Sequence, residues 1–311
     1  MTEVKKIATR AAYGEFLVEE GKKRKDLIVM DADLSGSTKT KMFAKTFPER
    51  FVQSGISEQD MIAEAAGIAL TGHVVCASSF AMFATGRAYE MIRNSIGYTG
   101  ANVKICATHA GITVGEDGAS HQTFEDIALM REIPGMIVIN PADAVSAKKL
   151  LSSVIEKDGP AYVRLGRSGV PVIYDDSAEF NIGKANLLRD GKDITVMATG
   201  IMVSEALEAA EILEKEGISV RVLDVHTIKP LDKEAVIKAA QETKGIVTAE
   251  EHSIIGGLGS AVAETLCTNY PSKMVMVGQK DVFGESGKPE ELKKKYGMTA
   301  NEIVKAVKKI I

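Results

Sequence analysis

The stretch SGISEQDMIAEAAGIAL, residues 54–70, decides the predicted fold. Its apolar residues recur at the spacing of one helix face, as Met61, Ile62 and Ala65 do. The pattern predicts a helix of small residues packed closely against a flat surface, with Glu58 where a loop becomes that helix. A carboxylate in the first turn of a helix is stabilised by the helix dipole. From this segment alone, Glu58 is either a helix-end charge or a functional acid.

Short apolar segments around this helix predict a parallel sheet. They are apolar throughout and are separated by helical patterns, which is typical of strands that are buried on both faces. A first helix is expected at residues 8–23. The expected strands are residues 27–34, 73–78, 103–109 and 135–141.

A second series of strands and helices predicts another, smaller α/β domain. Its expected strands are DITVMATG, SVRVLDVHTI, GIVTAEEH and KMVMVG, with helices at residues 203–216 and 258–269. The polar, turn-rich stretch before it predicts a linker. We therefore expect domains at residues 1–172 and 193–311, joined by a linker at residues 173–192.

Composition excludes several classes of function. The 311 residues are 45% hydrophobic, which is enough for buried cores, and carry a net charge of −4. Lys and Arg are spread along the chain, so no basic stripe predicts nucleic-acid binding. No apolar run reaches the roughly 18 residues of a membrane span, and the N-terminal segment lacks the apolar core of a signal peptide. We therefore expect no membrane association and a cytoplasmic location.

Signals for metals and dinucleotides are weak. Cys76, Cys106 and Cys267 are widely separated in apolar segments and are predicted to be reduced core residues. Without Cys-x-x-Cys or His-x-x-x-His spacing, no metal site is expected within the chain. The glycine cluster at residues 256–259 invites a dinucleotide interpretation, but it lacks the G-x-G-x-x-G spacing directly after a strand.

The stretch ATHAGITVGEDGASHQTFEDIALMREIPGM, residues 107–136, has an unusual density of ionisable groups. His109, Glu116, Asp117 and His121 fall among glycines that allow a compact loop. The loop begins where an expected strand ends, which is where parallel α/β sheets bind ligands. Such clustering exceeds what solubility requires, so a functional site is predicted there.

The stretch SSFAMFATGRAYEMIRNSI, residues 78–96, places Phe80 and Phe83 three positions apart. The two side chains share a face of a helix or turn, so they could hold a flat heterocycle between them by offset stacking. The simpler explanation of the pair alone is two core aromatics.

These three segments resemble thiamine-diphosphate enzymes of the transketolase type. The resemblance implies that Glu58 contacts the aminopyrimidine ring of thiamine diphosphate and exchanges a proton with it. This exchange favours the imino form that deprotonates the thiazolium carbon. The resemblance also implies that Phe80 and Phe83 line the pyrimidine pocket. Where many transketolases have a further aromatic residue, this chain has Gly86.

The loop at residues 107–121 closely matches the transketolase pattern THDSIGxGEDGPTHQP, with departures that include Ala110, Ala119 and Ser120. The match implies that His121 lies over the reacting carbon and helps proton transfer, and that Asp117 binds a substrate hydroxyl. The resemblance further implies a set of residues that grip the phosphate of a sugar phosphate, as cations and hydrogen-bond donors can. They are Arg10, Ser37, His109 and Arg167.

The resemblance runs from about residue 7 onward, but half of a transketolase is missing from it. The GDG motif, with which a preceding domain binds magnesium and the diphosphate, does not occur in the sequence. This implies the C-terminal section of a split transketolase, paired with an N-terminal subunit that holds most of the Mg²⁺ site in a two-plus-two heterotetramer. The implied activity is transfer of a two-carbon ketol unit from a ketose phosphate to an aldose phosphate, in pentose phosphate metabolism.

Three other functions stay open. The β subunit of a 2-oxoacid dehydrogenase has the same two domains and the same kind of Glu, but it has no reason to keep the phosphate-binding set or His109, Asp117 and His121. Half of a deoxyxylulose-phosphate synthase shares ISEQDM-like and DGxxHQ-like features, but the THAGITVGEDG loop fits transketolase better. A non-catalytic scaffold of the same fold is disfavoured because the residues implied to act are intact. They are Glu58, His109, Asp117, His121 and Arg167.

Overall fold

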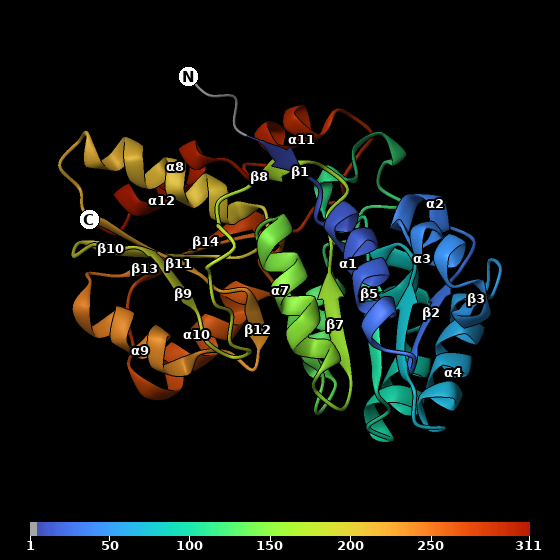
Figure 1. Cartoon of the computed structure of the whole chain (residues 1–311). Helices are drawn as coiled ribbons and strands as arrows, with labels where there is room; N and C mark the ends of the chain where they lie inside the picture. Colours follow the sequence, from blue (N-terminus) through green and yellow to red (C-terminus); the bar gives the residue numbers. More distant parts are fainter. Residues whose placement is uncertain (1–4) are drawn as a thin grey trace.

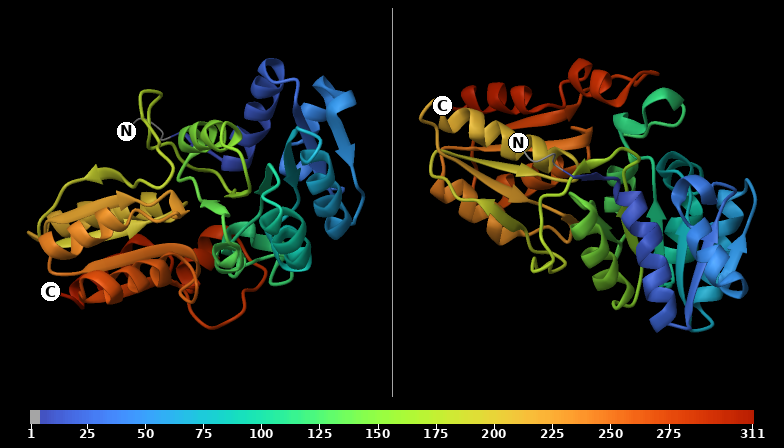
Figure 2. Two further views of the ribbon diagram at one scale, coloured as in Figure 1. Left: turned by 90° about the horizontal axis from the view of Figure 1, so that it is seen from below. Right: turned by 45° about the horizontal axis from the view of Figure 1, so that its top comes forward.

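Two large β-sheets, each covered by helices on both faces, form the computed structural model, which describes residues 5–311 (Figure 1). The first four residues of the predicted first domain lie outside the described residues. Two further views show that the sheets lie side by side rather than stacked (Figure 2). The predicted two-domain α/β fold is confirmed.

The first sheet is built mainly from the N-terminal half of the chain. Its strands lie in the order β12-β6-β7-β5-β4-β2-β3, and all neighbours are parallel except β12 and β6. The central strands are buried throughout, so helices must cover both faces. The strand bounds are β2 Leu27–Asp31, β3 Phe51–Gln53, β4 Val74–Ser78, β5 Val103–Ala107, β6 Ile137–Ile139, β7 Ala161–Arg164 and β12 Thr227–Lys229.

Different helices cover the two faces of this sheet. The small residues of α4 allow close packing against β4, as predicted, and Met61, Ile62 and Ala65 are buried there. On the same face lie α6 and a long helical segment with two π-helical turns. The bounds on this face are α4 Glu58–Ala69, η2 Met82–Arg87, α5 Tyr89–Met91, η3 Ile92–Tyr98 and α6 Asp126–Glu132. The opposite face carries α1 Thr9–Lys23, α3 Lys41–Thr46 and α7 Ala144–Ile155.

The second sheet has the order β14-β13-β10-β11-β9, with β9 antiparallel at one edge. Helices α8 and α12 cover one face, and α9 and α10 cover the other. Among residues 5–311, no helix combines the length and apolar character needed to cross a bilayer. The strand bounds are β9 Asn186–Arg189, β10 Ile194–Ala198, β11 Val220–Asp224, β13 Ile246–Ser253 and β14 Met274–Gln279. The helix bounds are α8 Met202–Glu214, α9 Lys233–Glu242, α10 Leu258–Asn269, α11 Pro289–Lys295 and α12 Ala300–Lys308.

Short segments join the two domains. A two-stranded sheet pairs β1 with β8, and α11 packs against η4, so parts of both domains enclose the loop after β5. The edge strand β9 lies inside the segment predicted to be a linker. The remaining bounds are β1 Lys6–Ile7, β8 Val170–Pro171, α2 Ser35–Thr38, and the 3₁₀ helices η1 Pro48–Arg50 and η4 Ile112–Asp117.

The prediction of one strand over SVRVLDVHTI was wrong, because the chain divides there between the two sheets. Residues 220–224 form β11 of the second sheet, whereas β12 pairs antiparallel with β6 at the edge of the first sheet. The backbone amide of Asn140 donates to the backbone carbonyl of His226 at 2.9 Å, which continues this pairing. An apolar run specifies a strand but not which sheet edge is open to it.

The prediction for the cysteines was also partly wrong. Cys76 on β4 and Cys106 on β5 are buried, as predicted, but Cys267 near the end of α10 is exposed. Its apolar neighbours in sequence occupy the buried face of the helix, whereas Cys267 points away from that face.

The glycine cluster at residues 256–259 serves a carboxylate of the chain itself. The Glu250 carboxylate on β13 accepts the backbone amides of Leu258 and Gly259, both at 2.7 Å, at the start of α10. The start of a helix favours an anion because its first amides are unpaired and its dipole is positive. Glu250 fills the place that a diphosphate would take, which argues against the dinucleotide interpretation.

We predict that Gly257→Ala destabilises the protein, because a Cβ at this position would overlap the buried Glu250 carboxylate. The expected loss in the free energy of unfolding is on the order of 2 kcal/mol. The control is Gly67→Ala on the exposed side of α4, where a Cβ meets nothing within 4 Å. That change should stabilise the chain by roughly 0.5–1 kcal/mol. Urea unfolding of both variants tests the pair, and equal midpoints would contradict the role of Gly257.

Candidate active site

The predicted site residues gather at the carboxyl-terminal edge of the first sheet. This edge is where parallel α/β sheets bind ligands, because the loops after the strands converge there. Arg10 joins them from the first turn of α1. The others each follow a parallel strand: Ser37 follows β2, Glu58 follows β3, Phe80 follows β4, His109 follows β5 and Arg167 follows β7.

Glu58 is the first residue of α4, but it is not exposed. Only 2% of its side chain is exposed, so of the two interpretations left open for Glu58, an exposed helix-end charge does not fit. Its Oε2 pairs with Arg87 Nη1 at 2.7 Å, and its Oε1 accepts the Ser79 hydroxyl at 3.3 Å. A buried carboxylate needs such partners, since an unpaired one is costly. Glu58 is thus paired with a cation, Arg87, that no sequence pattern indicated.

Arg87 was missed because no local pattern points to it. It lies 29 residues from Glu58 and ends the π-helical turn η2. A π-helical turn contains one more residue than an α-helical turn, so ordinary helical spacing misplaces the side chains on it. Such turns are frequent at functional sites, which agrees with the position of Arg87 beside Glu58.

Phe80 and Phe83 form a stack, not the predicted sandwich. Their ring centroids are 6.1 Å apart and nearly parallel, whereas a ring inserted between them would need about 3.5 Å on each side. The His109 ring also stacks on Phe80, with the ring centroids 3.7 Å apart. The Arg87 guanidinium lies over Phe83 at 5.0 Å, and His121 approaches the Phe83 edge at 5.2 Å. One line of contacts therefore joins His109, through both rings, to Arg87 and Glu58.

His109 is neutral and fixed in one tautomer. Burial lowers its pKa to about 3, and the charges of Arg10 and Arg167 act in the same direction. Its Nε2 lies 3.1 Å from Arg10 Nη1, which can only donate, so Nε2 accepts. Its Nδ1 then carries the proton and donates to the Thr108 hydroxyl at 2.8 Å.

Arg10 and Arg167 form a positive cluster around His109. Burial and the charge of Arg167 lower the pKa of Arg10, while Asp117 opposes them. Arg10 Nη1 also donates to the Ser37 carbonyl at 2.9 Å, so Ser37 enters this contact through its backbone. Arg10 Nε is buried with no hydrogen-bond partner among the described residues. Two close guanidinium groups and a spare donor suit an anion.

The loop after β5 holds the remaining predicted residues. Arg167 donates to the Val114 carbonyl and pairs with Glu116 at 2.7 Å, and its hydrogen bond lowers the pKa of that carboxyl. Asp117 is exposed at the end of η4. The Nδ1 of His121 is bonded to the Ser120 hydroxyl at 3.0 Å, which leaves Nε2 for a ligand. Glu116 thus restrains Arg167, while His121 keeps one ring nitrogen available.

Residues of the second domain contact this loop and fix its position, a contact that no sequence pattern predicted. Glu251 on β13 accepts the Thr113 amide at 2.7 Å, and Gly111 lies so close that a Cβ there would overlap the Glu251 carboxylate. Gly111 has a φ of 79°, which further favours glycine. The available signal was two adjacent carboxylates, Glu250 and Glu251, directly after the mostly apolar residues 246–249.

We predict that Arg87→Ala lowers the free energy of unfolding, because it leaves Glu58 buried without its cation. About 1 kcal/mol is expected rather than the larger cost of a fully buried pair, since 48% of the Arg87 side chain is exposed. The double variant Arg87→Ala with Glu58→Gln should cost less than the sum of the single variants. Strictly additive losses in urea unfolding would contradict the pairing.

We also predict that His109 makes stability depend on pH. Its pKa falls from 6.5 to about 3 on folding, so between these values the unfolded chain binds the extra proton. Stability therefore rises with pH across this window, by at most about 1.4 kcal/mol per pH unit. His109→Asn should flatten the dependence of urea unfolding between pH 6.5 and 4.5. An NMR titration of the His109 ring with a midpoint near its ordinary value would contradict the prediction.

Comparisons with known proteins agree with this geometry. The family model for the transketolase pyrimidine-binding domain matches residues 5–172, and that for the transketolase C-terminal domain matches residues 183–303. A Methanocaldococcus jannaschii protein described as a transketolase C-terminal section is 54% identical over 301 residues, covering 96% of this chain and 94% of that protein. A 6-deoxy-6-sulfo-D-fructose transketolase subunit of Clostridium sp. (strain MSTE9) is 43% identical over 301 residues. The match covers 97% of this chain and 94% of that protein.

A solved structure is also similar over nearly its whole length. It is described as a split gene transketolase in an inactive β4 tetramer, and it matches this chain with a TM-score of 0.92. The two chains are 53% identical, and the match covers 98% of each. This chain belongs to the transketolase family.

Proposed function

We propose that this chain is the C-terminal subunit of a split, thiamine-diphosphate-dependent transketolase. Together with a diphosphate-binding N-terminal subunit in a two-plus-two assembly, it transfers a two-carbon ketol unit from a ketose phosphate to an aldose phosphate. We place this activity in the cytoplasm and in pentose phosphate metabolism. Two relatives of matching length, described as a section and a subunit of transketolases, support the division into two chains.

The observation that carries the proposal is the line of contacts from Arg10 to Glu58. An anion-binding cluster lies at one end and a buried carboxylate at the other, with His109, Phe80 and Phe83 between them. A sugar phosphate needs both ends, since its phosphate must be held away from the carbon that reacts. A 2-oxoacid substrate carries no phosphate, so the dehydrogenase alternative leaves the Arg10 and Arg167 cluster without a ligand.

The residues around Glu58 fit the pyrimidine end of thiamine diphosphate. The Arg87 guanidinium is a flat, nitrogen-rich cation that lies over Phe83 and donates to the Glu58 carboxylate. It therefore stands in for a flat nitrogen heterocycle that makes the same two contacts. Because the Arg87 side chain is 48% exposed, it can turn aside without a large loss of buried contacts. The bound cofactor supplies the carbon nucleophile of the reaction.

The chain's own residues then take distinct roles. With the cofactor bound, Glu58 would hold or give up a proton at its Oε2, in exchange with the pyrimidine ring. His121 presents Nε2 to substrate hydroxyls and moves a proton there, while Asp117 reads a neighbouring hydroxyl. Arg10 and Arg167 bind the phosphate by charge and hydrogen bonds, and neutral His109 accepts from Arg10 and orients its guanidinium toward that site. The Mg²⁺ that accompanies the diphosphate falls mainly to the partner subunit.

We predict that the purified chain alone has no ketol-transfer activity and that adding the N-terminal subunit restores it.

In the restored complex, Arg167→Ala should lower kcat/KM for a ketose phosphate by roughly 30-fold, which corresponds to about 2 kcal/mol for a charge-assisted hydrogen bond. Most of the loss should appear in KM, because the phosphate contact is equally strong in the ground and transition states. Hydroxypyruvate, which has no phosphate, should be used almost as well as by the wild type.

Glu116→Gln is the matched control, because it removes the ion pair with Arg167 but keeps the guanidinium. It should affect the ketose phosphate far less than Arg167→Ala does. Turnover by the lone chain, shown free of host enzyme by mass spectrometry, would contradict the split enzyme. Equal losses on both substrates would contradict the phosphate role of Arg167.

A further inference from the structure

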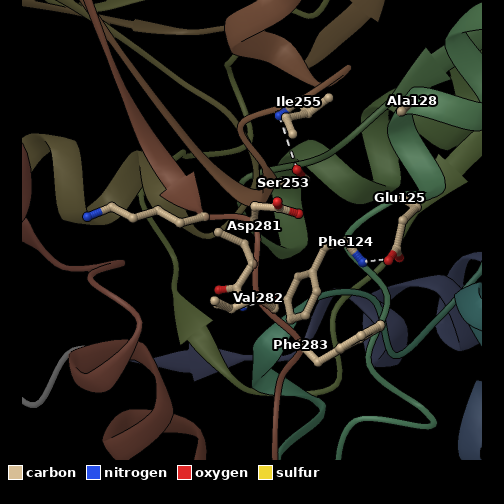
Figure 3. Close-up of a pocket in the computed structure, with 10 residues that line it drawn as sticks. Phe124, Glu125, Ala128, Ser253, Ile255, Asp281, Val282 and Phe283 are labelled. Carbon is tan, nitrogen blue, oxygen red and sulfur yellow. Dashed lines mark hydrogen bonds between the residues drawn. The ribbon is translucent and has the colours of Figure 1, made fainter.

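A pocket of about 390 Å³ lies where the two domains meet beside the active-site loop (Figure 3). The first domain supplies Phe124, Glu125 and Ala128 to its wall. The second domain supplies Ser253, Ile255, Gln279 and the segment 280–283. Figure 3 shows these groups of residues around one space, with Phe124 and Phe283 at the same side. The pocket plays no part in the proposed chemistry.

The second-domain wall of the pocket carries three exposed apolar side chains. Phe283 is 85% exposed, Ile255 is 63% exposed and Val282 is 57% exposed. Single exposed apolar side chains are normal on a protein surface, but three around one pocket mark an interaction site. These side chains would be removed from water by a partner that fills the pocket.

The polar groups of the pocket call for a ligand with hydrogen-bond donors. Gln279 Oε1 is buried and accepts no hydrogen bond from the described residues, while the Gln279 amide nitrogen donates to the Val282 carbonyl at 3.0 Å. The carboxylates of Glu125 and Asp281 also line the pocket, against one cation, Lys280. A ligand that brings positive charge and several N–H groups would satisfy Gln279 and both carboxylates.

An arginine side chain matches this combination. Its guanidinium is flat, so it can stack on the exposed aromatic ring of Phe283. It carries five N–H donors and no acceptor, so it can serve a carbonyl oxygen and a carboxylate at once. A lysine carries charge and donors but lacks the flat face.

Both walls of the pocket continue directly into the active-site loop. Phe124 lies two residues after Gln122, whose side-chain amide nitrogen donates to the Glu285 carbonyl at 2.9 Å. Ser286 lies against Gly118 of the same loop, so residues 280–286 run beside it. A subunit that covers Glu58, His121 and the phosphate-binding residues would therefore also reach this pocket.

We propose that the pocket receives an arginine side chain of the diphosphate-binding partner subunit and so fixes the position of that subunit over the shared active site. This inference rests on the proposed function, because it requires the partner subunit. It adds an anchoring site at the junction of the two domains, separate from the residues assigned to the reaction. Central aromatic and arginine contacts of this kind dominate the affinity of many interfaces.

The test measures binding between this chain and the N-terminal transketolase section of the same organism by sedimentation velocity and calorimetry. Phe283→Ala and Asp281→Lys should each raise the Kd by about 10-fold or more, because one removes the stacking face and the other repels the cation. Both side chains are exposed, so the variants should fold, and urea unfolding verifies this. Tyr98→Ala is the matched control, an aromatic that is 92% exposed at the opposite edge of the first sheet.

Each outcome separates the inference from the proposed function. A wild-type chain that does not bind the N-terminal section would overturn the proposed function. Wild-type binding that both pocket variants retain would overturn the pocket inference alone. Weaker binding by Phe283→Ala but not by Asp281→Lys would replace arginine by an apolar occupant. Loss of self-association without loss of partner binding would assign the pocket to a second copy of this chain.

Discussion

The buried ion pair between Arg164 and Asp126 is the contact on which the rest of the site depends. Arg164 Nε donates to Asp126 at 2.7 Å, and both side chains are at most 4% exposed. Burial pushes the pKa of Asp126 up, but the charge and hydrogen bonds of Arg164 outweigh it and hold the pKa below its ordinary value. The Tyr162 hydroxyl donates to the same carboxylate at 2.6 Å. A buried pair of this kind contributes little net stability, but it tolerates only one arrangement of its partners.

That arrangement connects three parts of the molecule that determine the shape of the active-site loop. Asp126 begins α6 directly after the loop, and Arg164 ends β7 just before Arg167. The other end of the Arg164 guanidinium donates to the Glu251 carbonyl of the second domain at 2.8 Å. The Glu251 carboxylate in turn holds the Thr113 amide. The second domain thus shapes the site although the predicted site residues all belong to the first domain.

The positive charges of the site lie at one end, and the Glu58 carboxylate lies at the other. Arg10 and Arg167 concentrate positive charge at one end, and burial keeps His109 neutral between them, so it adds hydrogen bonding without further repulsion. The stacked rings of Phe80 and Phe83 separate this end from the Glu58 carboxylate. The rings add distance between the two ends, and the Coulomb repulsion between a bound anion and the carboxylate falls with distance.

The sequence by itself determined the α/β class, the small-residue helix after Glu58 and the gathering of site residues after successive strands. These features are local: apolar periodicity sets each element, and parallel strands bring their carboxyl ends to one edge. Only the tertiary structure decided that Glu58 is buried against Arg87, that residues 219–228 divide between two sheets, and that Arg164 and Glu251 support the loop. The side-chain contacts among these join residues 29 to 138 positions apart. Periodicity fixes which face a side chain lies on, but which buried charges meet depends on how the crossovers and the two domains pack.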